Sequence, residues 1–178
     1  MDRTPHEIVN PLSLADPVGY SHALVVRPGR LVRVGGQTSR RPDGKVVGDS
    51  VAQQFDQALA NLVEALRAAG AEPAHVVDMC VYTTSMHSYR VNSGTIGSVY
   101  RRHMGRYYPP MTAVGVTDLM DPDALVALTC TAVIPEDAAD DLLHRAEARE
   151  LVEEAEETLA ADPLAARDPG VRPGRTRP

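Results

Sequence analysis

Residues able to take part in acid–base chemistry lie in or beside several short β-prone segments of this 178-residue chain. Histidine exchanges protons near neutral pH, and a tyrosine hydroxyl group can donate a proton to a bound group. Tyr20 and His22 are the candidates for catalysis, and Tyr82 and Tyr108 are further candidates for the wall of a pocket. A satisfied structural histidine is the alternative interpretation of His22.

The segment Tyr107-Tyr108-Pro109-Pro110-Met111-Thr112 is the most informative part of the sequence. It leads into the alternating run Ala113-Val114-Gly115-Val116, which indicates a strand that begins just after a proline turn. Near the start of this strand, Met111 offers a flexible and polarizable apolar surface. The ligand groups that Met111 can contact therefore limit which substrates a site at this strand can bind.

Sequence signals of metal sites, cofactor sites and nucleic-acid binding are missing. The chain has no GxSxG, HExxH, Walker or dinucleotide glycine pattern, and its six histidines have no persuasive metal-ligand spacing. We therefore expect no metal ion and no organic cofactor. The net charge of −6 gives no support to nucleic-acid binding.

The hydropathy pattern argues against a membrane protein. No apolar run approaches the length needed to cross a bilayer, and the segment Met1 to His6 has no apolar signal-peptide core. We therefore expect a cytoplasmic location and no contact with membranes.

Two helices are predicted. Ser50 and Gln53 have the spacing of a capping box, in which each side chain bonds a backbone amide at a helix start, and Gly70 ends the pattern. A weaker helix runs from near His87 to Met104, and Gly94 and Gly97 disfavour its first half. The apolar positions at helical spacing are Val51, Phe55, Leu59, Leu62, Val63 and Leu66 in the first helix, and Ile96, Val99, Tyr100, His103 and Met104 in the second, which Gly105 ends.

The remaining patterned segments predict strands. Ala23–Val26 and Leu31–Val34 flank a Pro28-Gly29 turn and predict a hairpin. In the strand from His75 to Thr84, we expect one set of side chains to pack under helices and the alternate set to face a cavity or a partner. The first set is Val77, Met79 and Val81, and the second is Asp78, Cys80, Tyr82 and Thr84. Two more strands follow, Thr112–Asp118 and Leu125–Ile134.

The predicted order is β-β-α-β-α-β-β, an α+β fold with one sheet and two helices on one of its faces. The other face carries a mixed set that is too polar for a core and too apolar for solvent, including Cys80, Tyr82, Thr129 and Thr131. Burial against other subunits would resolve this mixture.

Composition divides the chain into four parts. Residues 1–18 are predicted to form an N-terminal arm, and residues 19–134 the folded domain. An acidic C-terminal helix is predicted over 135–161, either as a docking element or as a solvated appendage. The Pro/Gly/Arg-rich segment 162–178 is predicted to be a disordered tail.

Several segments together resemble the RidA/YjgF family, the reactive intermediate or imine deaminases, over roughly Ile8 to Ile134. They are Asn10-Pro11, Gly19-Tyr20-Ser21-His22-Ala23, Val34-Gly35-Gly36-Gln37, the capped helix ending Ala68–Ala71, the strand Val76–Thr84, and Tyr100, Gly105 and Pro109-Pro110. The resemblance implies a chorismate-mutase-like fold with a mixed sheet, assembled as a homotrimer with small-molecule pockets at the subunit interfaces. It also implies hydrolysis of imines and enamines to ammonia and 2-oxo acids without metal or organic cofactor.

The chain departs from the family pattern at its two charged positions. Family members hold the substrate carboxylate with an arginine just after the proline turn, where this chain has Met111. A family glutamate on the last strand aligns with Ala127, and a frequent cysteine aligns with Ala113. We expect a pocket wall that is roomier and more apolar, which favours a larger and less anionic ligand. The full set of predicted substrate-binding residues is Gly36, Gln37, Tyr82, Tyr108, Met111, Ala113, Ala127 and Thr129.

A displaced charge remains open as an alternative. Arg33 or Arg102 could replace the missing arginine, and so could Arg101 or Arg106. The leading hypothesis is a divergent Rid-family enzyme that hydrolyses, tautomerises or cyclises an imine-type or enamine-type, amine-derived molecule in specialised metabolism. Its rival is a non-catalytic trimer that binds a metabolite or a protein. A standard 2-imino acid deaminase is the third possibility.

Overall fold

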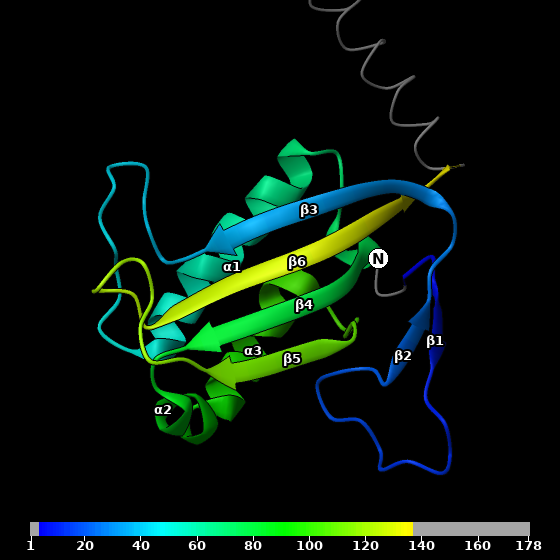
Figure 1. Ribbon diagram of the computed structural model, residues 1–178, viewed down its shortest axis with the longest axis horizontal. Coiled ribbons are helices and arrows are strands. Elements are labelled where there is room, and N and C mark those ends of the chain that lie inside the picture. The colour runs from blue at the N-terminus through cyan, green and yellow to red at the C-terminus, as the bar shows by residue number, and fades with distance from the viewer. Residues whose placement is uncertain (1–3, 137–178) are drawn as a thin grey trace, which may run out of the picture. The chain divides into compact units, whose positions relative to one another are not determined.

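The computed structural model describes residues 4–136 (Figure 1). Most of the helix predicted over 135–161, and all of the tail predicted over 162–178, lie outside the described residues. Pro135 belongs instead to the last strand of the sheet.

A four-stranded mixed sheet is the centre of the fold. Its strands are β3 (Gly29–Gln37), β4 (Val76–Thr83), β5 (Met111–Gly115) and β6 (Val126–Pro135), in the spatial order β3-β6-β4-β5. β4 and β5 run parallel, and the other neighbours are antiparallel. In Figure 1, α1 (Val51–Ala68) and α3 (Ser93–Met104) lie behind this sheet, so its front face carries no helix. The predicted α+β fold with one mixed sheet is confirmed.

The start of α1 follows the sequence closely. The Gln53 amide donates to the Ser50 hydroxyl group at 3.3 Å, and Asp49 N–H donates to the Gln53 side-chain carbonyl at 2.9 Å. The return bond of the capping box therefore comes from the residue before Ser50. The six predicted apolar side chains are all buried: Val51, Phe55, Leu59, Leu62, Val63 and Leu66.

The predicted alternation of buried and exposed side chains fails at the start of β4. The register against β6 shifts between Val76 and Asp78, which marks a β-bulge or irregularity. As a result Val76 is fully buried and Val77, predicted to point at the helices, is only half-buried. Beyond this point Met79 and Val81 pack under the helices as predicted.

The predicted hairpin is wrong. β2 (Ala23–Val25) pairs with β1 (Glu7–Val9), inside the predicted arm, and the two form a separate small sheet. Gly29 is the first residue of β3 and lies against β6, where an added Cβ would come within 2.0 Å of the Ile134 carbonyl oxygen. The glycine thus permits a close approach of two strands. β-prone runs alone do not specify which partner each run pairs with.

The second predicted helix is two helices with one break. α2 (Met86–Val91) ends at Asn92, whose side-chain amide donates to the Ser88 carbonyl at 2.8 Å. Asparagine competes in this way with regular helix hydrogen bonds. α3 then follows, with its predicted apolar face buried except for the half-buried His103, and Gly105 ends it at a φ of 75°.

Gln54 joins three segments at one end of the sheet, although only 2% of its surface is exposed. Its side-chain nitrogen donates to the carbonyl groups of Gly48 and Asp123, both at 3.0 Å. Its side-chain oxygen accepts from Leu125 N–H at 2.7 Å. The loop before α1 and the entry to β6 therefore depend on a single satisfied amide.

We expect Gln54→Leu to lower the free energy of unfolding by about 2–4 kcal/mol, because two carbonyl groups and one amide lose their buried partner. The matched variant Gln57→Leu removes only one bond, to Asn61, and should lower it by less than about 1 kcal/mol. Urea unfolding of both variants measures the difference. Equal losses would contradict the role assigned to Gln54.

Candidate functional site

Each carbonyl group of the turn before β5, residues 107–110, accepts a hydrogen bond that holds the turn in place. Pro109 and Pro110 leave the segment 107–110 with only two backbone N–H groups. Its four consecutive carbonyl oxygens all accept hydrogen bonds from elsewhere in the fold. The donors are the Tyr100 hydroxyl to Tyr107 (2.9 Å), the Ser21 hydroxyl to Tyr108 (2.5 Å), the Ser21 amide to Pro109 (3.2 Å) and the Met79 amide to Pro110 (3.1 Å). Met111 therefore begins β5 at a fixed position.

Strand register decides which way the predicted wall residues face. Met111 lies opposite Met79, and Ala113 lies opposite Val81, so both side chains are on the helix side of the sheet. Ala127 lies opposite Tyr82, on the helix-free side. Within one chain, Met111 and Ala113 thus do not share a wall with Ala127.

Most of the other predicted binding residues are also separated from Met111. Thr129 lies opposite Cys80 on the helix-free face. Gly36 and Gln37 lie at the end of β3, and this strand is at the opposite edge of the sheet from β5. Only Tyr108 among them joins Met111 around one cavity.

This cavity has a volume of about 440 Å³ and follows one face of α3. Its wall includes Met111 at the sheet edge, Tyr108 from the proline turn, and Val18 and Gly19 from the loop before β2. The remaining lining residues are Phe55, Tyr89, Ser93, Gly94, Ile96, Gly97, Tyr100 and Arg101.

Aromatic rings form much of the cavity wall. Tyr100 and Tyr108 are stacked, with centroids 4.7 Å apart and planes at 12°, and Phe55 meets Tyr89 edge-on at 6.1 Å. Burial raises the pKa of Tyr100 and of Tyr89, so both phenols stay protonated at neutral pH. The Tyr100 hydroxyl is already bound to Tyr107, whereas the Tyr89 hydroxyl has no hydrogen-bond partner within residues 4–136.

Two glycines keep the α3 side of the cavity open. A Cβ at Gly94 would meet no atom within 4 Å, and one at Gly97 would meet only the Arg101 guanidinium, at 3.6 Å. Neither glycine is needed for an unusual backbone angle. The residues that weaken the helix prediction are therefore the ones that leave space beside the helix.

Only one of the four candidate arginines lines the cavity of Met111. Arg102 is bound to Asp56 at 2.5 Å, and Arg33 lies opposite Thr131 on the helix-free face of the sheet. Arg106 lines a different cavity. Arg101 alone borders the Met111 cavity, and its guanidinium donates to the neutral Ser98 hydroxyl at 3.3 Å.

Asp56 links α1 to α3 through an arginine and a histidine. Its carboxylate contacts Arg102 at 2.5 Å and His103 Nε2 at 2.6 Å. Burial by itself raises the pKa of Asp56, but hydrogen bonds from His103 and Arg102 outweigh this effect and leave the pKa below its usual value. These two contacts therefore connect α1 to α3, and Arg102 is already paired with a carboxylate.

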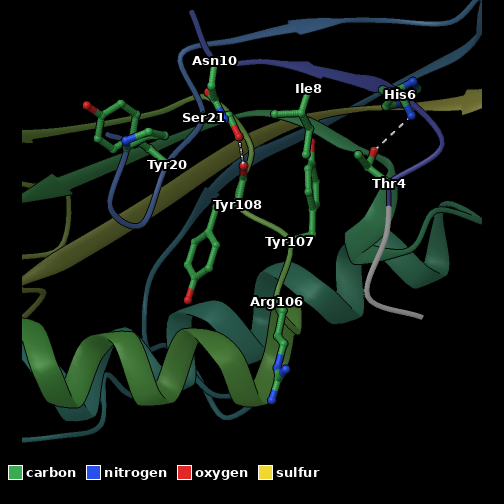
Figure 2. A pocket seen from close by; sticks show the side chains of 10 residues that line it. Thr4, His6, Ile8, Asn10, Tyr20, Ser21, Arg106, Tyr107 and Tyr108 are labelled. Atoms are coloured by element: carbon green, nitrogen blue, oxygen red, sulfur yellow. Dashed lines mark hydrogen bonds between the residues drawn. The ribbon is translucent and has the colours of Figure 1, made fainter. Parts of the chain in front are cut away.

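The second cavity, of about 410 Å³, lies between β1 and the proline turn (Figure 2). Tyr20, Asn10 and Arg106 line it, and Tyr108 lines both cavities. In Figure 2 the Tyr108 ring extends from the turn toward the helix below it, and the Tyr20 ring lies higher in the view, beside Ser21. Tyr20 thus borders the neighbouring cavity, while Gly19 borders the one with Met111.

His22 is held by hydrogen bonds from its side chain and from its backbone. Its Nε2 bonds the Ala15 carbonyl at 2.8 Å, and its backbone amide donates to the Asn10 side chain at 2.9 Å. The Tyr20 ring meets it edge-on at 5.3 Å. These contacts close the loop between β1 and β2, and His22 lines neither cavity.

Sequence reasoning missed Phe55, Tyr89 and Ile96 as lining residues. Apolar periodicity predicts only that Phe55 and Ile96 lie on the apolar faces of their helices, since it does not distinguish a core contact from a cavity wall. A usable signal is the pair of glycines that flank Ile96 in the sequence and line the same cavity. In residues 4–136, no three histidine, cysteine, aspartate or glutamate side chains gather as a metal site would require.

Comparison with known proteins identifies the family. Residues 12–134 match the profile of the family described as Endoribonuclease L-PSP. The human 2-iminobutanoate/2-iminopropanoate deaminase is 30% identical over 101 residues, which cover 56% of this chain and 69% of the enzyme. The rat enzyme of the same name is 33% identical over the same shares of each chain. The chain therefore belongs to the Endoribonuclease L-PSP family, the RidA/YjgF group that its motifs resemble.

Solved structures agree with this assignment. The Rid-family protein YyfB of Yersinia pestis superposes with a TM-score of 0.66 at 31% identity, covering 75% of this chain and 99% of that protein. A Mycobacterium tuberculosis member of the YjgF/YER057c/UK114 family gives a TM-score of 0.50 at 31% identity, covering 72% and 99%. The fold is the chorismate-mutase-like fold of this family. Among residues 4–136, no helix is both long and apolar enough to pass through a lipid bilayer.

His6 connects the wall of the second cavity to the central sheet. Its Nε2 bonds the Val133 carbonyl at 3.1 Å, and Nδ1 accepts from Arg27 N–H at 3.3 Å, so the ring is neutral with its proton on Nε2. Burial lowers the pKa of His6 below its ordinary value of 6.5, although the Val133 carbonyl acts in the opposite direction. Burial also lowers the pKa of neighbouring His75.

We expect the melting temperature to fall as the pH drops from about 7.5 to about 5.5. A depressed folded pKa means that His6 contributes fully above 6.5 and that its contribution is lost as pH falls toward the lower folded value. His6→Asn cannot titrate, so its melting temperature should fall less, with His75 still contributing. Parallel slopes for parent and variant in thermal melts would contradict the role of His6.

Proposed function

We propose that this protein is a divergent Rid-family enzyme of the cytoplasm that acts on an imine-type or enamine-type, amine-derived molecule in specialised metabolism. Hydrolysis, tautomerisation and cyclisation are the reactions in question, and a standard 2-imino acid is not the substrate. The observation that carries the proposal is Met111, an apolar residue at the first position of β5, in a cavity walled by aromatic rings.

Replacement of an arginine by Met111 has a calculable effect on small anionic substrates. Each hydrogen bond to a charged group contributes about 1.5–3 kcal/mol, so losing a two-bond carboxylate contact weakens binding by about two to four orders of magnitude. Methionine favours apolar and polarizable ligand groups instead. The cavity therefore suits a ligand larger than a four-carbon imino acid.

Proton donors remain in the cavity after this change. Imine hydrolysis needs water to add to the C=N carbon while the nitrogen accepts a proton, and tautomerisation also moves a proton. Tyr89 has a protonated hydroxyl without a protein partner in residues 4–136, and Tyr108 adds a second phenol. Tyr20 stands beside the same turn in the adjoining cavity. These phenols support proton transfer to a bound nitrogen atom.

A homotrimer is part of the proposal. The helix-free face of the sheet has half-buried Cys80, Tyr82, Thr129 and Thr131. Contact with a second copy would cover this face and would place Ala127 and Thr129 at a subunit interface. Within a single chain, the sheet separates these two residues from Met111. The rival function, a non-catalytic trimer that binds a metabolite or a protein, is favoured by the absence of the family's arginine and glutamate.

With freshly generated 2-iminobutanoate, we expect this protein to release 2-oxobutanoate within about twofold of the buffer rate, because Met111 cannot hold the carboxylate at the start of β5 and the four-carbon acid is too short to fill the cavity. Trapping the imine with semicarbazide measures the competing rate. The human deaminase, 30% identical to this chain, is the positive control. A rate tenfold or more above buffer, on the order of the energy of one charged hydrogen bond, would refute the altered specificity.

We expect sedimentation equilibrium to give three times the chain mass of 19.2 kDa. Thr129→Arg, which places a charge on the helix-free face, should yield monomers at concentrations where the parent is trimeric. Thr95→Arg, on the exposed surface of α3, should leave the trimer intact. A monomeric parent protein would remove the trimer from the proposal.

A further inference from the structure

The cavity beside Met111 is elongated along α3. Its lining residues on this helix run from Ser93 to Arg101, eight residues apart, which corresponds to about 12 Å along the helix axis. A four-carbon acid, with bonds of about 1.5 Å, spans less than half of that length. A ligand that fills the cavity must therefore reach along two turns of the helix.

Arg101 is the cation best placed to meet an anionic group in this cavity. Within the part of the chain that the structure describes, no carboxylate forms an ion pair with it, and its hydrogen-bond partner is the uncharged Ser98. Gly97 leaves room for the guanidinium, which lies 3.6 Å from the position a Cβ would take. By contrast, Arg102 and Arg40 are each paired with an aspartate.

The rest of the wall is apolar or aromatic. Phe55 and Ile96 are buried, and Tyr100 offers only its ring, since its hydroxyl is bound to the Tyr107 carbonyl. Stacked Tyr108 extends the aromatic surface toward Met111. This combination of one cation and a long aromatic wall selects an anion attached to an apolar body.

We infer that Arg101 is the specificity residue that takes over the anion-binding role of the missing arginine, from α3 instead of β5. The substrate class is an imine or enamine with an aromatic or branched apolar body and a single carboxylate that contacts Arg101. This inference rests on the proposed function, because it assigns the substrate class of the same cavity. It concerns binding, which can be measured without turnover.

Three stable probes separate the contributions: 3-phenylpropanoate, its neutral amide 3-phenylpropanamide, and butanoate. Dissociation constants from NMR titration of the full chain should be at least about tenfold lower for 3-phenylpropanoate than for butanoate. Arg101→Gln should weaken 3-phenylpropanoate by about tenfold or more and leave the amide within about twofold, because only the acid carries the charge.

Two further variants control for location and for folding. Arg106 lines the second cavity, so Arg106→Gln should change none of the dissociation constants by more than about twofold. Gly97→Leu fills the cavity beside α3 and should weaken the acid and the amide together, with helix content unchanged by circular dichroism.

Several results would overturn the assignment of Arg101. They are equal weakening of acid and amide by Arg101→Gln, a larger effect of Arg106→Gln on the acid, or no preference of the parent for 3-phenylpropanoate over butanoate. Failure of the proposed function is distinguishable from these. Charge-dependent binding at Arg101 with no turnover of any imine would support the site and refute the enzyme.

Discussion

The site depends on the hydrogen bonds that hold the proline turn before β5. Pro109 and Pro110 have no backbone N–H group, so the segment 107–110 has fewer backbone donors than carbonyl groups. Donors from α3, from β4 and from the loop before β2 supply all four bonds. Because Ser21 provides two of them, it fixes the loop that separates the two cavities as well as the turn itself. Both cavity walls are thereby positioned by one short segment.

Local signals in the sequence were sufficient for much of the fold. The capping residues and the apolar period of α1 act within the helix itself, so no knowledge of tertiary structure was needed. The failures have two causes. The pairing of β2 with β1, the register shift at Val77 and the break at Asn92 all depend on partners that are distant in the chain or on side chains that compete with the backbone.

The site was only partly predictable for a related reason. A proline turn followed by alternation marks a strand entry, so the sequence alone points to Met111 and Tyr108, which line one cavity. Tyr20 and His22 have suitable chemistry, but the loop they close turns His22 toward the Ala15 carbonyl. Arg101 could not be separated from its neighbours by composition. Its distinction is that it borders the cavity without a carboxylate partner in the described residues.

Because the backbone of the turn is fixed by hydrogen bonds to its main-chain atoms, the side chains that line the site can change in evolution without altering the backbone that positions them. Pairing with Met79 and the bonds to the carbonyl groups involve main-chain atoms of the segment, so they are the same whichever side chain stands at position 111. An arginine can be exchanged for a methionine there without loss of the framework that positions it. A lineage can therefore change its ligand through a few side chains while inheriting an unchanged scaffold.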